Sequence, residues 1–211
     1  MTSADFIGFV RLVIAGDVAK ISDRLRTHPR LATAAASAGA FFVSIRHYLY
    51  KGDTALHMAA AAFRRPVAEI LVSHGADWRA KNRRGAQPLH YAADANHSEP
   101  RAQQDVIEYL ISVGADPNSL DKSGVAPLHR AVRTRSLSAV RALLDGGADP
   151  RLRNKSGSRP LHLAVHNTGR SGSGSDEAHR QQAEIIKLLL ERGAKQTDTD
   201  AQAKKYFKGD R

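Results

Sequence analysis

The chain has 211 residues, of which 42 % are apolar, 25 % are charged and 6 % are aromatic, a composition typical of a folded globular protein. It contains no cysteine, which excludes disulfides, thiolate catalysis and cysteine-based zinc sites, and no apolar run approaches the roughly 18 residues needed to cross a bilayer. The formal net charge of +11 indicates an acidic partner or a polyanion, although a basic surface that is merely solvated gives the same total.

The N-terminal part of the chain predicts a pair of helices. Its apolar stretch FIGFVRLVIAG (6–16) follows Asp5 and contains Arg11, whereas a signal peptide has a basic leader and an unbroken apolar run. We therefore expect this stretch to belong to the fold of a cytoplasmic protein. Asp17 suits the N-cap of the second helix. Residues 33–50 match no pattern and are either an enlarged connection or an inserted segment.

The rest of the chain repeats two short motifs four times. The first motif reads GDTALHMAA, GAQPLHYAA, GVAPLHRAV and GSRPLHLAV, starting at Gly52, Gly85, Gly124 and Gly157. The second reads VAEILVSHGAD, VIEYLISVGAD, AVRALLDGGAD and IIKLLLERGAK, starting at Val67, Val106, Ala139 and Ile185. Both motifs carry apolar residues at helical spacing, and the glycine in the second motif suits a helix end. Each repeat is therefore predicted to form two short helices.

The spacing between the motifs locates two insertions. Within a repeat, the leucine of the first motif and the glycine that ends the second helix are 19 residues apart in repeats one and three. They are 25 and 32 residues apart in repeats two and four, which therefore contain insertions of 6 and 13 residues. From that glycine to the leucine of the next repeat the spacing is always 14 residues.

This constant segment is called the finger. The first, second and third fingers read ADWRAKNRRG (76–85), ADPNSLDKSG (115–124) and ADPRLRNKSG (148–157). In each, an Asn or Asp three residues before the last glycine predicts a tight turn in which the side chain bonds the local backbone. The constant length indicates that neighbouring fingers must stay in register.

A unit of two helices and a finger, with the motifs G-x-[TAQR]-[PA]-L-H-x-A and L-L-x-x-G-A-D, resembles the ankyrin repeat. The resemblance covers residues 50–195 and implies an all-α solenoid of stacked helix-turn-helix units with hairpin-like fingers. We expect a single domain over 1–211, divided into an N-terminal capping repeat with an inserted segment (1–50), four repeats (51–84, 85–123, 124–156 and 157–195) and a C-terminal tail or cap (196–211).

A histidine occupies the same place in every first motif, at His57, His90, His129 and His162. Consecutive histidines are at least 33 residues apart, one in each repeat, whereas a metal site needs three or four ligands at one point. In ankyrin repeats this histidine bonds backbone near its own finger. The resemblance therefore implies an architectural role, and no metal or cofactor is expected.

Neither insertion predicts catalysis. The segment GRSGSGSD (169–176) lacks the G-x-x-x-x-G-K-[ST] spacing of a phosphate loop and has the composition of a flexible connection. The segment NHSEPRAQQ (96–104) is expected to be a surface loop, and Asp94, His97 and Glu99 form an acid and base set without a positioned nucleophile. We therefore expect no enzyme.

Basic and aromatic residues gather on the fingers and first helices. The resemblance implies that the residue after each histidine faces the concave side of the array, which gives Met58, Tyr91, Arg130 and Leu163. Because arginine and aromatic residues commonly anchor interfaces, we predict a partner-binding surface composed of Trp78, Arg79, Lys81, Arg83, Arg84, Tyr91, Arg130, Arg133, Arg151, Arg153 and Lys155. A solvated charge run would look the same in the sequence.

Together these patterns favour a monomeric, non-enzymatic module that binds a protein of acidic character on its concave face, without membrane association. The alternative is a nucleic-acid-associated protein held by phosphate contacts. The net charge supports this alternative, and the lack of a groove-entering motif weakens it.

Overall fold

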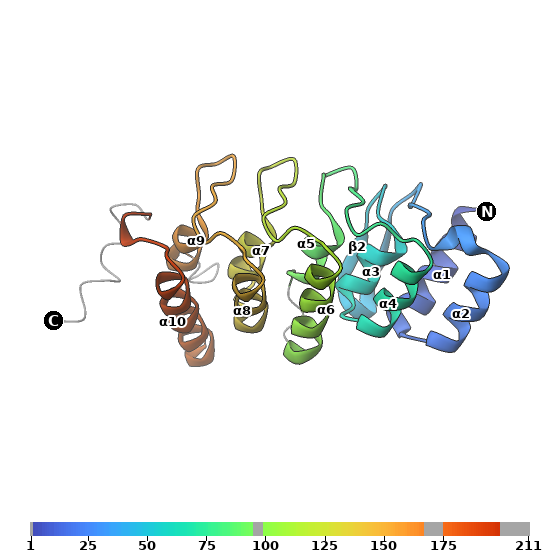
Figure 1. Cartoon of the computed structure of the whole chain (residues 1–211), viewed down its shortest axis with the longest axis horizontal. Helices are drawn as coiled ribbons and strands as arrows, with labels where there is room; N and C mark the ends of the chain where they lie inside the picture. Colours follow the sequence, from blue (N-terminus) through green and yellow to red (C-terminus); the bar gives the residue numbers. More distant parts are fainter. Residues whose placement is uncertain (1, 95–98, 167–174, 199–211) are drawn as a thin grey trace.

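The computed structural model describes residues 2–94, 99–166 and 175–198 (Figure 1). Pairs of helices follow one another in a row from the N-terminal to the C-terminal end, and the fingers project along one edge. The inner helices are α1 (Ser3–Ala15), α3 (Ala55–Ala61), α5 (Pro88–Ala92), α7 (Pro127–Arg133) and α9 (Pro160–His166). The outer helices are α2 (Val18–Thr27), α4 (Arg65–Ser73), α6 (Pro100–Ser112), α8 (Leu137–Asp145) and α10 (Asp176–Glu191). The predicted all-α solenoid is confirmed.

The first helix pair packs onto the repeats through its apolar stretch. Phe9 and most of the apolar residues around it are buried, so the stretch 6–16 belongs to the fold, as predicted. Asp17 caps α2 by accepting a hydrogen bond from the amide of Lys20 at 3.1 Å. The predicted N-cap is therefore correct.

The leucine of the first motif is buried in every repeat. Each inner helix contacts the inner helix before and after it, and the outer helices do the same. Leu56, Leu89, Leu128 and Leu161 are 0–1 % exposed, and the alanine three residues after each leucine is also buried. These small residues let neighbouring helices approach closely, so the apolar layers join into one continuous core.

Three of the repeated histidines join consecutive repeats. The Nδ1 atom of His57 accepts a hydrogen bond from the amide of Thr54 at 3.1 Å, and its Nε2 atom donates to the carbonyl of Ala86 at 3.1 Å. His90 and His129 make the equivalent pairs of bonds, at 3.0–3.2 Å. The expected bond near the histidine's own finger is confirmed, because Nε2 reaches the residue directly after the last glycine of that finger. The ring thus ties the start of one inner helix to the next repeat.

Neighbouring fingers are bonded backbone to backbone. The amide of Arg83 donates to the carbonyl of Lys51 at 3.2 Å, that of Lys122 to Arg84 at 2.9 Å, and that of Lys155 to Ser123 at 3.0 Å. Within each finger the predicted Asn or Asp side chain accepts from local amides, at 2.8–3.1 Å. An added residue would break this register, which explains the constant spacing.

The close approach of the fingers gives a stability prediction. Gly124 has a φ of 71°, and a Cβ there would lie 2.8 Å from the backbone nitrogen of Lys155. Gly157 has a similar φ of 79° with no neighbour within 4 Å of its Cβ position. Gly157→Ala should therefore lower the free energy of unfolding by about 1 kcal/mol, from backbone strain alone. Gly124→Ala should cost a further ~1–3 kcal/mol from the clash. Urea unfolding measures both, and equal losses would contradict the contact.

Residues 33–50, whose conformation the sequence left open, form a finger enlarged by a β-hairpin. At the base, the amide of Ala36 donates to the carbonyl of Asp53 at 2.7 Å, and that of Gly52 donates to Ala36 at 2.8 Å. Beyond the base, β1 (Ala40–Phe42) pairs antiparallel with β2 (His47–Leu49). Phe42 and Leu49 are buried in the core and fix the hairpin to the array.

The two insertions lengthen outer helices. Residues 100–104, expected to lie in a surface loop, form the start of α6, and α10 already begins at Asp176. Buried glutamines hold both helices in place: Gln103 donates to the carbonyl of Ala92 at 2.8 Å, and Gln182 to that of Ala164 at 2.7 Å. The loop prediction is therefore wrong for 100–104. Residues 169–174 and His97 lie outside the described residues.

A screen of the described helices for a membrane span found none with the required length and apolarity.

Candidate functional site

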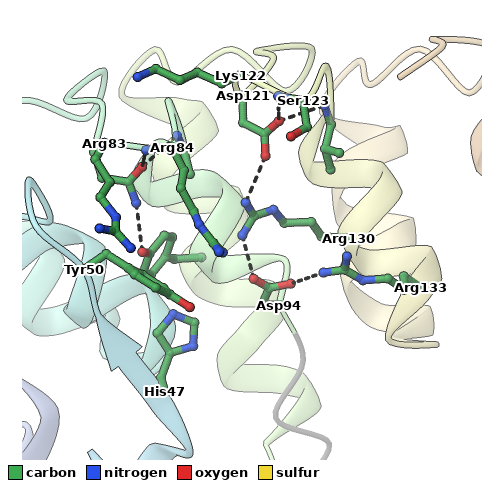
Figure 2. Close-up of a pocket in the computed structure, with 14 residues that line it drawn as sticks. His47, Tyr50, Arg83, Arg84, Asp94, Asp121, Lys122, Ser123, Arg130 and Arg133 are labelled. Atoms are coloured by element: carbon green, nitrogen blue, oxygen red, sulfur yellow. Dashed lines mark hydrogen bonds and ion pairs between the residues drawn. The ribbon is translucent and has the colours of Figure 1, made fainter. Parts of the chain in front are cut away.

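A pocket of about 590 Å³ opens between the fingers and the inner helices. The hairpin, the first and second fingers, α5, α7 and the residues after α5 line it (Figure 2). Five predicted partner-binding residues line the pocket, namely Arg83, Arg84, Tyr91, Arg130 and Arg133. His47, Tyr50, Asp94, Asp121 and Lys122 also line it and were not predicted.

A buried polar cluster supports the pocket from below. The Asp53 carboxylate, which is fully buried, accepts hydrogen bonds from the Tyr91 hydroxyl at 2.8 Å, from the Asn82 amide at 2.8 Å and from the backbone amide of Tyr50 at 2.6 Å. Burial, together with the Asp53 carboxylate, raises the pKa of the Tyr91 phenol above its ordinary value. This cluster fixes the hairpin end, the first finger and α5 relative to one another.

Tyr91 is buried, which corrects its predicted place on an exposed binding surface. Its ring contacts that of His47 with the centroids 4.7 Å apart, and only 2 % of the residue is exposed. Burial lowers the pKa of His47 although the Asp94 and Asp53 carboxylates oppose this effect. The imidazole is therefore neutral at pH 7.

Arg130 is held between two carboxylates. One terminal nitrogen of its guanidinium lies 2.7 Å from Asp94 and the other 3.2 Å from Asp121, as Figure 2 shows. Burial alone would lower the pKa of Arg130, but the two carboxylates outweigh it and the pKa is raised. Only 12 % of the Arg130 side chain is exposed, although Arg130 lines the pocket, and its predicted role in binding a partner stays a prediction. Arg133 lies 3.5 Å from the same Asp94 carboxylate.

Arg83 and Arg84 have no carboxylate partner among the described residues. Their guanidinium groups lie over the ring of Tyr50, at 5.6 and 4.6 Å from its centroid, as cation–π contacts require. Both residues are exposed, and Lys122 extends along the rim above them (Figure 2). Tyr50 thus orients two cations toward the pocket and leaves their charge available.

The pocket therefore carries an excess of three positive charges. Five basic side chains line it against two carboxylates, and two of the five, Arg130 and Arg133, are paired internally. The remaining charge comes from Arg83, Arg84 and Lys122. A concave surface of one sign raises the local concentration of ions of the other sign, so the arrangement is suited to an anionic group.

The other predicted residues lie outside the pocket. Trp78 is half-buried beside Gly114, at the end of α6, and the Arg79 guanidinium lies 5.6 Å from its ring. The remaining four are exposed on the first and third fingers: Lys81, Arg151, Arg153 and Lys155.

The missed residues have different sequence signals. Lys122 occupies the same finger position as Arg83 and Lys155, two residues before the last glycine of the finger, so alignment of the fingers could have found it. His47 and Tyr50 belong to a stretch with no repeat pattern.

Among the described residues, no group of three or more His, Asp or Glu side chains is arranged to hold a metal ion.

Comparison with known families gives one result. A model of ankyrin repeats, consisting of three copies, matches residues 31–100 and 100–200, which is most of the chain. None of the curated proteins compared with the chain matches it.

Proposed function

Because the chain belongs to the ankyrin-repeat family, whose members generally bind proteins and do not catalyse reactions, we propose that its concave pocket binds an acidic segment of a protein partner. The observation that carries this proposal is the pair of exposed guanidinium groups of Arg83 and Arg84, which lie on the Tyr50 ring without a carboxylate partner among the described residues. A carboxylate from outside would supply the missing charge.

Binding in this pocket would require little reorganisation. The first and second fingers are bonded to each other through Lys122 and Arg84, and Tyr50 is bonded through its amide to the buried Asp53. Rigid presentation of this kind reduces the conformational entropy lost on association. The positive excess would also speed the encounter with an acidic partner, most strongly at low salt.

Charge reversal at the pocket tests the proposal. Arg83→Glu with Arg84→Glu should weaken binding of a fluorescent octaglutamate peptide by about a hundredfold, because both unpaired cations are replaced by like charges. Fluorescence anisotropy measures the affinity, and circular dichroism checks the fold. The matched control, Lys81→Glu with Arg153→Glu, makes the same change of charge at exposed finger positions that do not line the pocket and should cost less than about threefold. An equal loss in the control would contradict a pocket-specific site.

Nucleic acid is the second candidate, favoured by the exposed basic side chains on the first and third fingers: Arg79, Lys81, Arg151, Arg153 and Lys155. Phosphate contacts would make the affinity for a random-sequence duplex fall steeply between about 50 and about 200 mM salt. In that case the Lys81→Glu and Arg153→Glu control should lose as much duplex affinity as the pocket variant loses.

A further inference from the structure

The β-hairpin carries most of the large apolar side chains exposed on the described surface. Phe41 is 58 % exposed, Val43 77 % and Tyr48 40 %. Elsewhere in the described chain only Val18 and Leu120 belong to this class. Scattered single residues of this kind are ordinary on a protein surface, whereas a cluster on one element marks an interaction site.

The pairing of the hairpin explains this exposure. Phe41 and Tyr48 are cross-strand partners, so their side chains lie on the same face. Phe42 and Leu49, on the opposite face, are buried. Burial of the inner face already anchors the hairpin to the array. Anchoring therefore does not explain why the outer face is apolar as well.

This outer face continues into the concave pocket. The rings of Tyr48 and Tyr50 are 4.8 Å apart, and the Arg84 guanidinium lies 4.6 Å from the Tyr50 ring. The Tyr48 ring centroid and the Arg84 guanidinium are thus at most about 9.4 Å apart, which an extended peptide spans in about two to three residues. Phe41, Tyr48, Tyr50, Arg84 and Arg83 form one surface, called here the aromatic–cationic row.

We infer that the aromatic–cationic row binds a peptide segment in which a large apolar side chain lies two or three residues from an acidic one. This inference rests on the proposed function and adds to the acidic residue of the ligand a large apolar side chain. The unpaired cations select the acidic residue, and the exposed rings of Phe41 and Tyr48 supply the apolar contact. A second copy of this chain fits poorly, because a two-fold interface on this surface would bring two cationic pockets together.

Three synthetic peptides test the inference with the full chain. The first, Ac-Gly-Ser-Phe-Ser-Glu-Glu-Ser-Gly, carries both groups; the second has Ala in place of Phe; the third has Gln in place of both Glu residues. The first should bind the wild-type chain about tenfold more tightly than the second, as expected when one aromatic anchor is removed. Fluorescence anisotropy of labelled peptides measures the affinities.

Three variants separate the two halves of the row. Phe41→Ser should remove the difference between the first and second peptides, and Tyr48→Ser should do the same. Arg84→Ala should weaken the first and second peptides by about the same factor and leave the third unchanged. Because Phe41 and Arg84 are exposed, the melting temperatures of these variants should stay close to that of the wild type.

Each contrary outcome has one meaning. If the first two peptides bind the wild-type chain equally and Arg84→Ala weakens both, the inference is overturned and the proposed function stands. If Arg84→Ala weakens neither, the proposed function falls and the inference with it. The same holds if none of the peptides binds at a protein concentration of about 1 mM. The inference is also overturned if sedimentation shows that the wild-type chain is a dimer and that Phe41→Ser is a monomer, because a second copy of the chain would then occupy the row.

Discussion

Lowering the pH from 7 to 4 is expected to reduce the free energy of unfolding by about 3 kcal/mol through His90 alone. Burial is the main cause that lowers the pKa of His90, to about 4. Its Nδ1 atom accepts the amide hydrogen of Gln87, so protonation of the ring would remove a buried acceptor. Burial also lowers the pKa of His57 and of His129. Because the folded-state pKa of each of the three rings is lowered, all three effects have the same sign.

The direction follows from proton binding. An unfolded histidine has a pKa of about 6.5, so between that pH and the native value near 4 the unfolded chain binds more protons than the folded chain. The contribution of His90 to the free energy of unfolding is therefore complete above about pH 6.5 and falls as the pH decreases through this window. Once the folded ring is also protonated, this contribution changes no further. Carboxylates with lowered pKa values, such as Asp121, act at lower pH.

Urea unfolding at a series of pH values from 7.5 to 4 measures this effect. Near pH 5, His90 should contribute a slope of about 1.4 kcal/mol per pH unit, the value for one proton. His90→Gln should reduce the slope by about this amount even though it also lowers stability at pH 7. A free energy of unfolding that stays constant from pH 7.5 to 4.5 would contradict the neutral, bonded state of the three rings.

Leu128→Ala should lower the free energy of unfolding by about 2–5 kcal/mol. Leu128 is 1 % exposed in α7, between α5 and α9, so truncation leaves a cavity in a layer that two repeats share. Leu120→Ala is the matched control, because Leu120 lies on the second finger and is 43 % exposed. The control should cost less than about 0.5 kcal/mol.

The midpoint and slope of urea unfolding measure both leucine variants. A loss for Leu128→Ala no larger than that for Leu120→Ala would contradict the packing of the inner helices.

The helices and the register of the fingers follow from the sequence because both depend on local patterns. Leucine and glycine at fixed spacing mark the inner helices and the ends of the outer helices. The constant 14-residue spacing indicated that fingers must align, which the bonds from Lys122 to Arg84 and from Lys155 to Ser123 confirm. The starts of α6 at Pro100 and of α10 at Asp176 were missed, because an insertion that extends a helix has the polar composition of a loop.

The pocket was predicted less completely because it depends on contacts between distant residues. Arg83 and Arg84 were found through their place on a finger. The burial of Tyr91 depends on its contact with His47, which belongs to a hairpin without a repeat pattern. The pairing of Arg130 depends on Asp94, which lies 36 residues away in the sequence. The repeat motifs and their resemblance to the ankyrin repeat indicate which residues face the concave side. They do not specify which of those side chains another element covers.

The positions of the two insertions have a practical consequence. Both occur where an inner helix is joined to its outer helix, and the three fingers between the four repeats keep their length. In the third repeat, which has no insertion, the same connection runs from Thr134 to Ser136. A fluorescent reporter or an affinity tag placed there would follow an arrangement that the chain already tolerates twice, and would leave the bonds between neighbouring fingers intact.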